Sequence, residues 1–115
     1  MDHLTPQQVA ARLQDGTLPA PLLLDVREPW EHETARIAGA TLVPMSGLAA
    51  RIEEIASLQE DAEGTPRQLI CICHHGARSM QVAAFLEKQG FEQVANMSGG
   101  IHAWSQQVDP SVPTY

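Results

Sequence analysis

The chain has 115 residues, of which 43 % are hydrophobic and 18 % are charged. This length suits one domain, residues 1–115, built around its own core. The formal net charge of -7, with only 7 Lys and Arg residues, argues against a nucleic-acid-binding protein, because the phosphate backbone attracts clustered basic side chains.

The first predicted element is a helix that begins after Thr5. Residues 5–8 combine an N-cap threonine, a first-turn proline and a capping-box glutamine. Val9 and Leu13 then share one face, and Gly16 ends the helix. No basic stretch followed by an apolar segment precedes it, and the longest apolar runs have the length of strands. We therefore expect a cytoplasmic protein that does not enter a membrane.

The first predicted strand covers residues 22–26, which are apolar except for Asp25, as in a strand covered on both faces. Residues 28–33 form a short helix opened by Pro29. A turn at 37–40 then leads into an extended element at 41–43. The polar residues from Asp25 to Arg27 should point into the crevice at the end of this strand.

The second half of the chain continues the alternation of helices and strands. The predicted elements are a helix from Ser46 to about 58, a polar loop at 59–66, a strand at 67–72, a helix to about 88, a strand at 91–97, a helix from 98–100 through Trp104, and a tail at 108–115. Such alternation predicts right-handed crossovers. The fold class is therefore α/β, with three layers and a mostly parallel central sheet flanked by helices.

Cys73 ends the apolar strand and is followed by a short loop, His74-His75-Gly76-Ala77, before Arg78 and Ser79. Ligand crevices in parallel sheets open at this end of the strands. Inward-facing loop amides and the following helix start would favour the thiolate form of Cys73, with Arg78 adding a permanent positive charge. The alternative is that Cys73 only packs in the core, but its position favours a nucleophile.

Cys71 lies two residues before Cys73, so both side chains point to the same face of the strand. A disulfide between them would be strained, and Cys71 is best interpreted as a small buried hydrophobic residue. A Cys-x-Cys metal site would need two more ligands, and His74 and His75 are too close in sequence to complete a relaxed tetrahedron. We expect no metal and no cofactor.

Three blocks of sequence together resemble the rhodanese family over nearly the whole chain. They are Asp25-Val26-Arg27 with Glu31 and Ile37-Ala38-Gly39-Ala40; Cys73 to Ser79; and Ser98-Gly99-Gly100-Ile101-His102-Ala103-Trp104. The ending Asp109 to Tyr115 also resembles the close of rhodanese domains, both free-standing and fused to sulfur-carrier activating enzymes. The resemblance implies a sulfurtransferase that takes a sulfane sulfur from thiosulfate or a persulfide and passes it to a thiol, cyanide or sulfur-relay protein.

The family pattern gives Cys73 the catalytic role and makes His74, His75, Gly76, Ala77 and Arg78 the loop around its outer sulfur. Asp25, Arg27 and Ser79 would support this site, although Asp25 and Arg27 can equally be a plain ion pair. The two-domain thiosulfate enzymes of the family have an arginine where this chain has Glu31, and a basic residue where it has His75. The resemblance therefore implies that thiosulfate is a poor substrate here, with His75 helping only when protonated.

Two other classes of function remain open from the sequence. One is a non-catalytic or redox-sensing module that uses the same fold for protein contacts. The other is a small cysteine-dependent phosphatase or arsenate reductase, but related phosphatase loops place five residues between the cysteine and the arginine. Only four separate Cys73 from Arg78 here, and a shorter loop suits one sulfur better than a phosphoryl group.

Overall fold

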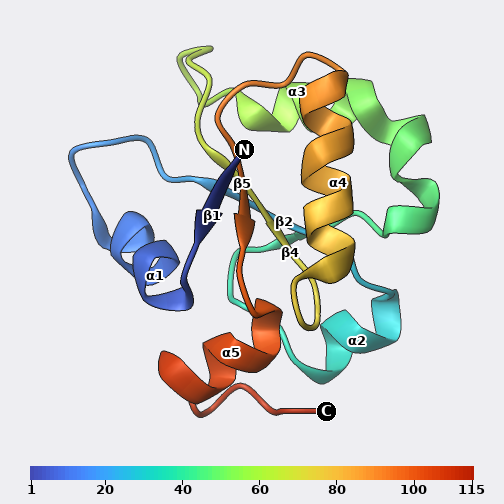
Figure 1. Ribbon diagram of the computed structural model, residues 1–115. Helices are drawn as coiled ribbons and strands as arrows, with labels where there is room; N and C mark the ends of the chain where they lie inside the picture. The colour runs from blue at the N-terminus through green and yellow to red at the C-terminus, as the bar shows by residue number, and fades with distance from the viewer.

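The computed structural model describes residues 1–115 and contains a five-stranded sheet in which every strand pair is parallel. The strand order is β1-β5-β4-β2-β3. The strands are β1 (Asp2–Leu4), β2 (Leu22–Asp25), β3 (Thr41–Leu42), β4 (Leu69–Ile72) and β5 (Val94–Met97). The predicted three-layer α/β class is confirmed, because helices cover both faces of the sheet (Figure 1).

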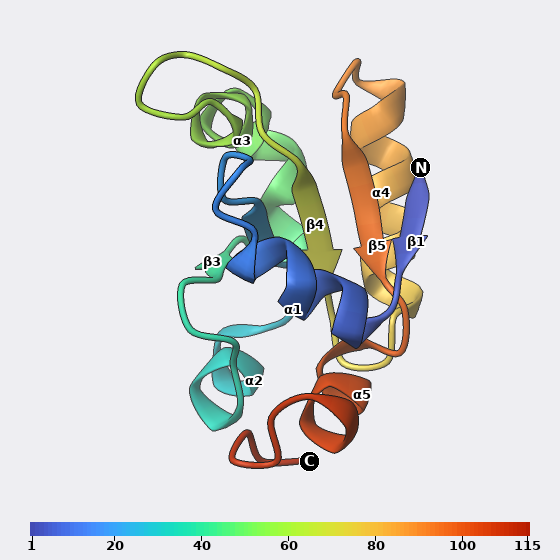
Figure 2. The same ribbon diagram turned by 90° about the vertical axis from the view of Figure 1, so that its left-hand side faces the viewer.

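Helices connect successive strands, and one further helix follows the last strand. They are α1 (Pro6–Gln14), α2 (Pro29–Thr34), the 3-10 segment η1 (Met45–Arg51), α3 (Ile52–Gln59), α4 (Ala77–Lys88) and α5 (Gly100–Gln107). Figures 1 and 2 show α1 and α4 on opposite sides of the sheet. No helix is long and apolar enough to cross a membrane.

The alternation of side chains along β4 builds two separate cores. Leu69, Cys71 and Cys73 join the core beneath α3 and α4, whereas Ile70 and Ile72 join the core beneath α1 and α5. Both cysteines are free thiols on the same face, as predicted from their spacing. Burial raises the pKa of the Cys71 thiol, so this sulfur stays protonated and serves as a core residue.

Three elements differ from the sequence predictions. The edge strand β1 was not predicted, because its three residues carry no apolar run; it pairs with β5, and Leu4 packs against the core beneath α1 and α5. The helix expected from Ser46 begins as the 3-10 segment η1 and becomes α-helical at Ile52. Strand β5 begins at Val94 rather than residue 91, since Gln93 adopts a positive φ of 58° that interrupts an extended chain.

The topology brings the candidate residues to one edge of the sheet. Strand β4 lies at the centre of the sheet, and β2 pairs with it so that Asp25 lies beside Ile72. The loop after β4 lies at the carboxyl edge of the sheet, next to α2, α5 and the C-terminal tail (Figure 1). This edge is where ligands bind in open parallel sheets.

Candidate active site

The sulfur of Cys73 lies inside the short loop that joins β4 to α4. The backbone N–H of Gly76 donates a hydrogen bond to the sulfur over 3.0 Å, and the hydroxyl oxygen of Ser79 lies 3.2 Å from it. Ser79 Oγ also contacts Asn96 Oδ1 from β5. The single Ser79 proton is directed to Asn96 Oδ1, which can only accept, so the Gly76 N–H is the donor that faces the sulfur and stabilises negative charge on it.

Two glycines make this tight loop possible. Gly76 has a φ of 107°, and a Cβ there would lie 3.1 Å from the backbone nitrogen of Gly99. Gly100 has a φ of 61°, and a Cβ there would overlap the backbone carbonyls of Cys73 and His74. Both positions need the left-handed conformation and the close approach that glycine permits.

The start of α5 holds the loop from below. The amide of Ile101 donates to the carbonyl of Cys73 over 2.9 Å, and the amide of His102 donates to the carbonyl of His74 over 3.1 Å. These bonds satisfy helix-start amides that have no partner within α5. The loop is therefore fixed between two helices, and Cys73 itself is only 1 % exposed.

Arg78 is paired away from the sulfur, with Glu31 of α2. Its two terminal nitrogens donate to the two carboxylate oxygens over 2.7 and 2.8 Å. Arg78, together with the hydroxyl of Tyr115, lowers the pKa of Glu31 to about 2 despite burial of the carboxylate. The sequence predicted that Arg78 adds a permanent positive charge at the loop, and the structure pairs this charge with the Glu31 carboxylate.

Asp25 and Arg27 form a buried pair below this site. Arg27 is 0 % exposed and donates to both Asp25 oxygens over 2.9 and 2.7 Å. Burial by itself raises the pKa of Asp25, but hydrogen bonds from Arg27 and His32 outweigh burial and hold it below its ordinary value. The bonds of Arg27 go to Asp25, to backbone carbonyls and to Tyr115, which is the ion-pair alternative left open by the sequence.

Tyr115 links the buried pair to the rim of the site. Its hydroxyl accepts from Arg27 over 2.8 Å and donates to Glu31 over 2.7 Å. Its ring stacks on His74 with a centroid separation of 3.9 Å. Burial raises the pKa of Tyr115 to about 12, so the hydroxyl keeps its proton. These contacts of Tyr115 anchor the C-terminal tail against the site.

The structure brings together most of the predicted residues and adds three that the sequence did not assign. Cys73, His74, His75, Gly76, Ala77 and Arg78 form the loop, Ser79 reaches the sulfur, and Glu31, singled out for its effect on the donor, pairs with Arg78. The additional residues are Asn96, His102 and Tyr115. Asn96 carried one signal, a polar side chain in the otherwise apolar strand 94–97, whereas Tyr115 lies 84 residues from Glu31 in the chain.

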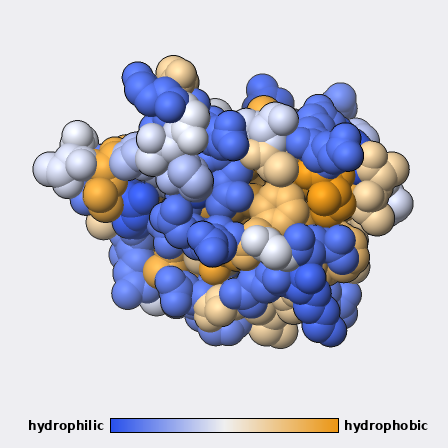
Figure 3. Space-filling view, turned by 90° about the horizontal axis from the view of Figure 1, so that it is seen from above, coloured by the Kyte–Doolittle hydropathy of each residue, from blue (hydrophilic) through white to orange (hydrophobic).

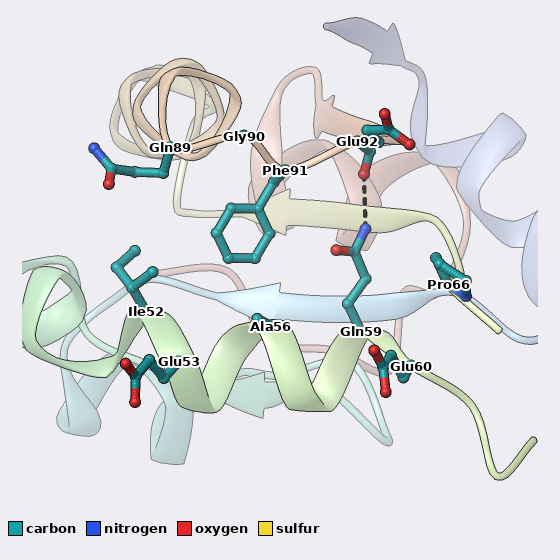
Figure 4. A pocket seen from close by; sticks show the side chains of 10 residues that line it. All are labelled: Ile52, Glu53, Ala56, Gln59, Glu60, Pro66, Gln89, Gly90, Phe91 and Glu92. Atoms are coloured by element: carbon teal, nitrogen blue, oxygen red, sulfur yellow. Dashed lines mark hydrogen bonds between the residues drawn. The ribbon is translucent and has the colours of Figure 1, made fainter. Parts of the chain in front are cut away.

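A surface cleft of about 380 Å³ lies at the opposite end of the sheet (Figure 4). It opens between α3 and the segment 89–92 that precedes β5. There Gln59 donates to the carbonyl of Glu92 over 2.7 Å. Apolar side chains surrounded by hydrophilic ones are visible on this end of the molecule (Figure 3). The cleft contains none of the predicted site residues.

The contact between Glu31 and Arg78 leads to a pH-dependent prediction. We expect Glu31→Gln to lower the free energy of unfolding by about 1–2 kcal/mol at neutral pH, through the loss of a charged hydrogen bond. Because folding depresses the Glu31 pKa from 4.5 to about 2, this stabilisation is present above about pH 4.5 and is lost as the pH falls towards 2. Urea denaturation between these pH values measures the difference. A difference that stayed constant with pH would contradict the assignment.

Comparisons with known proteins agree with this geometry. The rhodanese-like domain family model matches residues 5–107. A sulfurtransferase from Allochromatium vinosum is 36 % identical over 79 % of this chain and 78 % of its own length. The probable adenylyltransferase/sulfurtransferase MoeZ of Mycobacterium tuberculosis is 35 % identical over 97 % of this chain, which spans only 26 % of that relative's length.

Solved structures agree on the fold. The solution NMR structure of a rhodanese-like domain from Anabaena sp. superposes with a TM-score of 0.75 and 26 % sequence identity, over 92 % of this chain and 74 % of that one.

Proposed function

Because the chain belongs to the rhodanese-like domain family, we propose that it transfers sulfur through a persulfide formed on Cys73. Its sulfurtransferase relatives support a role in sulfur transfer. The observation that carries the specific proposal is the position of the Cys73 sulfur inside the loop, where the Gly76 N–H donates to it over 3.0 Å. Cys71 offers no alternative, since it is buried in the core with a raised pKa.

The proposed reaction needs no outside oxidant or reductant. The Cys73 thiolate attacks the terminal sulfur of the donor, and a sulfur–sulfur bond forms while the donor's own sulfur–sulfur bond breaks. The donor leaves as a thiolate or sulfite and takes the bonding electron pair. An acceptor thiolate or cyanide then attacks the outer sulfur and releases the Cys73 thiolate. The hydrogen bond from the Gly76 N–H stabilises the charge on sulfur at both steps.

The pairing of Arg78 bears on the choice of donor. A doubly charged donor such as thiosulfate gains most from a free guanidinium, but Glu31 already occupies both terminal nitrogens. The preferred donor is therefore a persulfide with a single negative charge. The acceptor is a thiol, cyanide or a sulfur-relay protein, in line with the sulfur-transfer relatives.

The same pairing weakens the phosphatase alternative. A phosphate ester would need a cation aimed into the loop to balance its charge. Arg78 instead points to Glu31, and only four residues separate it from Cys73. Both features favour binding of a sulfur atom, rather than a phosphoryl group, inside this loop.

The test is to incubate the protein with each of two donors, a small persulfide and thiosulfate, and to measure its intact mass. We expect intact mass spectrometry to show one added sulfur per chain, removable by a thiol, and faster loading from a small persulfide than from thiosulfate. Glu31→Gln should raise the thiosulfate rate several-fold relative to the persulfide rate, because it frees Arg78. Glu33→Gln is the matched control, since Glu33 is an exposed neighbour on α2.

No added sulfur from either donor would overturn the proposed function. An unchanged donor preference in Glu31→Gln would overturn only the role given to the pairing of Arg78.

A further inference from the structure

Three histidines from two separated parts of the chain meet beside the Cys73 loop. His74 and His75 belong to the loop, and His102 lies in the first turns of α5. One ring nitrogen from each lies within 4.8 Å of one from each of the others. The ring centroids of His74 and His75 are 4.0 Å apart, and those of His75 and His102 are 4.9 Å apart.

Two of these rings carry nitrogens that no other group in the protein satisfies. Nε2 of His74 and Nδ1 of His102 are shielded from solvent and have no hydrogen-bond partner. A buried polar atom without a partner costs free energy, and an ion or water at that point is its usual explanation. The unsatisfied atoms thus belong to the same cluster that the geometry identifies.

Histidine binds metal ions through an unprotonated nitrogen of the neutral imidazole ring. No acidic side chain takes part in the cluster. A set of three neutral nitrogen donors suits Zn²⁺ and neighbouring transition metals and is poorly suited to Mg²⁺ or Ca²⁺, which prefer oxygen.

We propose that His74, His75 and His102 form a binding site for a divalent transition-metal ion of the zinc type. Zinc–nitrogen bonds of about 2.0–2.1 Å in a tetrahedron place the nitrogens about 3.4 Å apart. The three nitrogens therefore need to approach one another only modestly. The exposed side chain of His75 has the freedom to make that adjustment.

Three protein ligands leave a fourth tetrahedral position for water. His74 is held in place by stacking on Tyr115, and α5 fixes His102. The ion would tie the Cys73 loop to α5 through side chains, in addition to the backbone bonds already there. Metal binding does not require the Cys73 thiol, because the three protein ligands are all histidines.

The experiment uses the full chain without an affinity tag, since a histidine tag would itself bind metal. Zn²⁺ is titrated against a chromophoric chelator, and we expect one ion per chain. His102→Gln should weaken binding at least about tenfold, because even the loss of groups around a metal ligand costs about 10–100-fold. His75→Gln should do the same, and it covers the case in which His102→Gln fails to fold.

His3→Gln is the matched control, because His3 is exposed on β1 and outside the cluster. Cys73→Ser should retain binding. NMR signals of three of the five histidine rings should shift on addition of Zn²⁺. Unchanged affinity in His102→Gln and His75→Gln would overturn the proposal. Loss of binding in Cys73→Ser would also overturn it, because the thiolate would then be holding the metal.

Discussion

Cys73→Ser should reduce sulfur loading below detection. The hydroxyl of serine fits the position of the thiol and can accept the same hydrogen bond from Gly76. It is nevertheless far too weakly acidic to attack a sulfur atom without a general base, and no histidine contacts Cys73 Sγ. Intact mass spectrometry after incubation with a persulfide donor gives the direct measurement, and thiocyanate formation from cyanide gives a second.

Cys71→Ser is the matched control for this result. Cys71 lies in the core, two residues earlier on the same face of β4. Its replacement should keep sulfur loading while lowering stability by about 1–3 kcal/mol, because a hydroxyl is buried without a partner. If Cys73→Ser still acquired sulfur, or if loading required Cys71, the assignment of the nucleophile would be wrong.

Arg27→Met should destabilise the fold by about 3–5 kcal/mol, since it leaves a buried carboxylate without its cation. Asp25 and Arg27 are 1 % and 0 % exposed, so water cannot replace the lost partner. A loss of this size is a large part of the total stability of a domain, which is about 5–15 kcal/mol. Urea denaturation at neutral pH measures the effect.

The pH dependence separates loss of the ion pair from simple loss of packing. In the native protein the Asp25 pKa is lowered, so its stabilisation is present above its ordinary value of 3.8 and is lost on acidification. Without Arg27, burial dominates and raises the Asp25 pKa above its ordinary value of 3.8. The stability of the variant should therefore fall as the pH rises above 3.8. The double variant Asp25→Asn with Arg27→Met should be more stable than Arg27→Met alone. If the free energy of unfolding of Arg27→Met lay within about 1 kcal/mol of that of the native protein, the pair would not be structurally important.

The sequence predicted the sheet and the loop because their signals are local. The apolar run before Cys73, the glycine in the loop and the alternation of helices and strands are all readable within short windows. The edge strand β1 was not predicted, because one apolar residue, Leu4, in a segment of three gives no such signal.

The electrostatics of the site were less predictable because they depend on contacts between distant residues. Arg78 and Glu31 are 47 residues apart, so nothing in the local sequence shows that the arginine is paired. Similarly, His102 meets His74 only because the start of α5 packs under the loop. The resemblance identified the residues of these blocks, whereas the folded chain determines which of them touch.

The near-complete burial of Cys73 has a kinetic consequence. With 1 % of the residue exposed, we expect only small reagents to reach the sulfur within the fixed loop. Reaction rates should then depend on reagent size more than on intrinsic reactivity, and a slim persulfide should outpace a bulky alkylating agent. The same cover would shield a bound sulfur from peroxide and from stray thiols between encounters. The burial of Cys73 should thus restrict sulfur exchange to partners that can reach into the loop, and should protect the bound sulfur atom from other reagents.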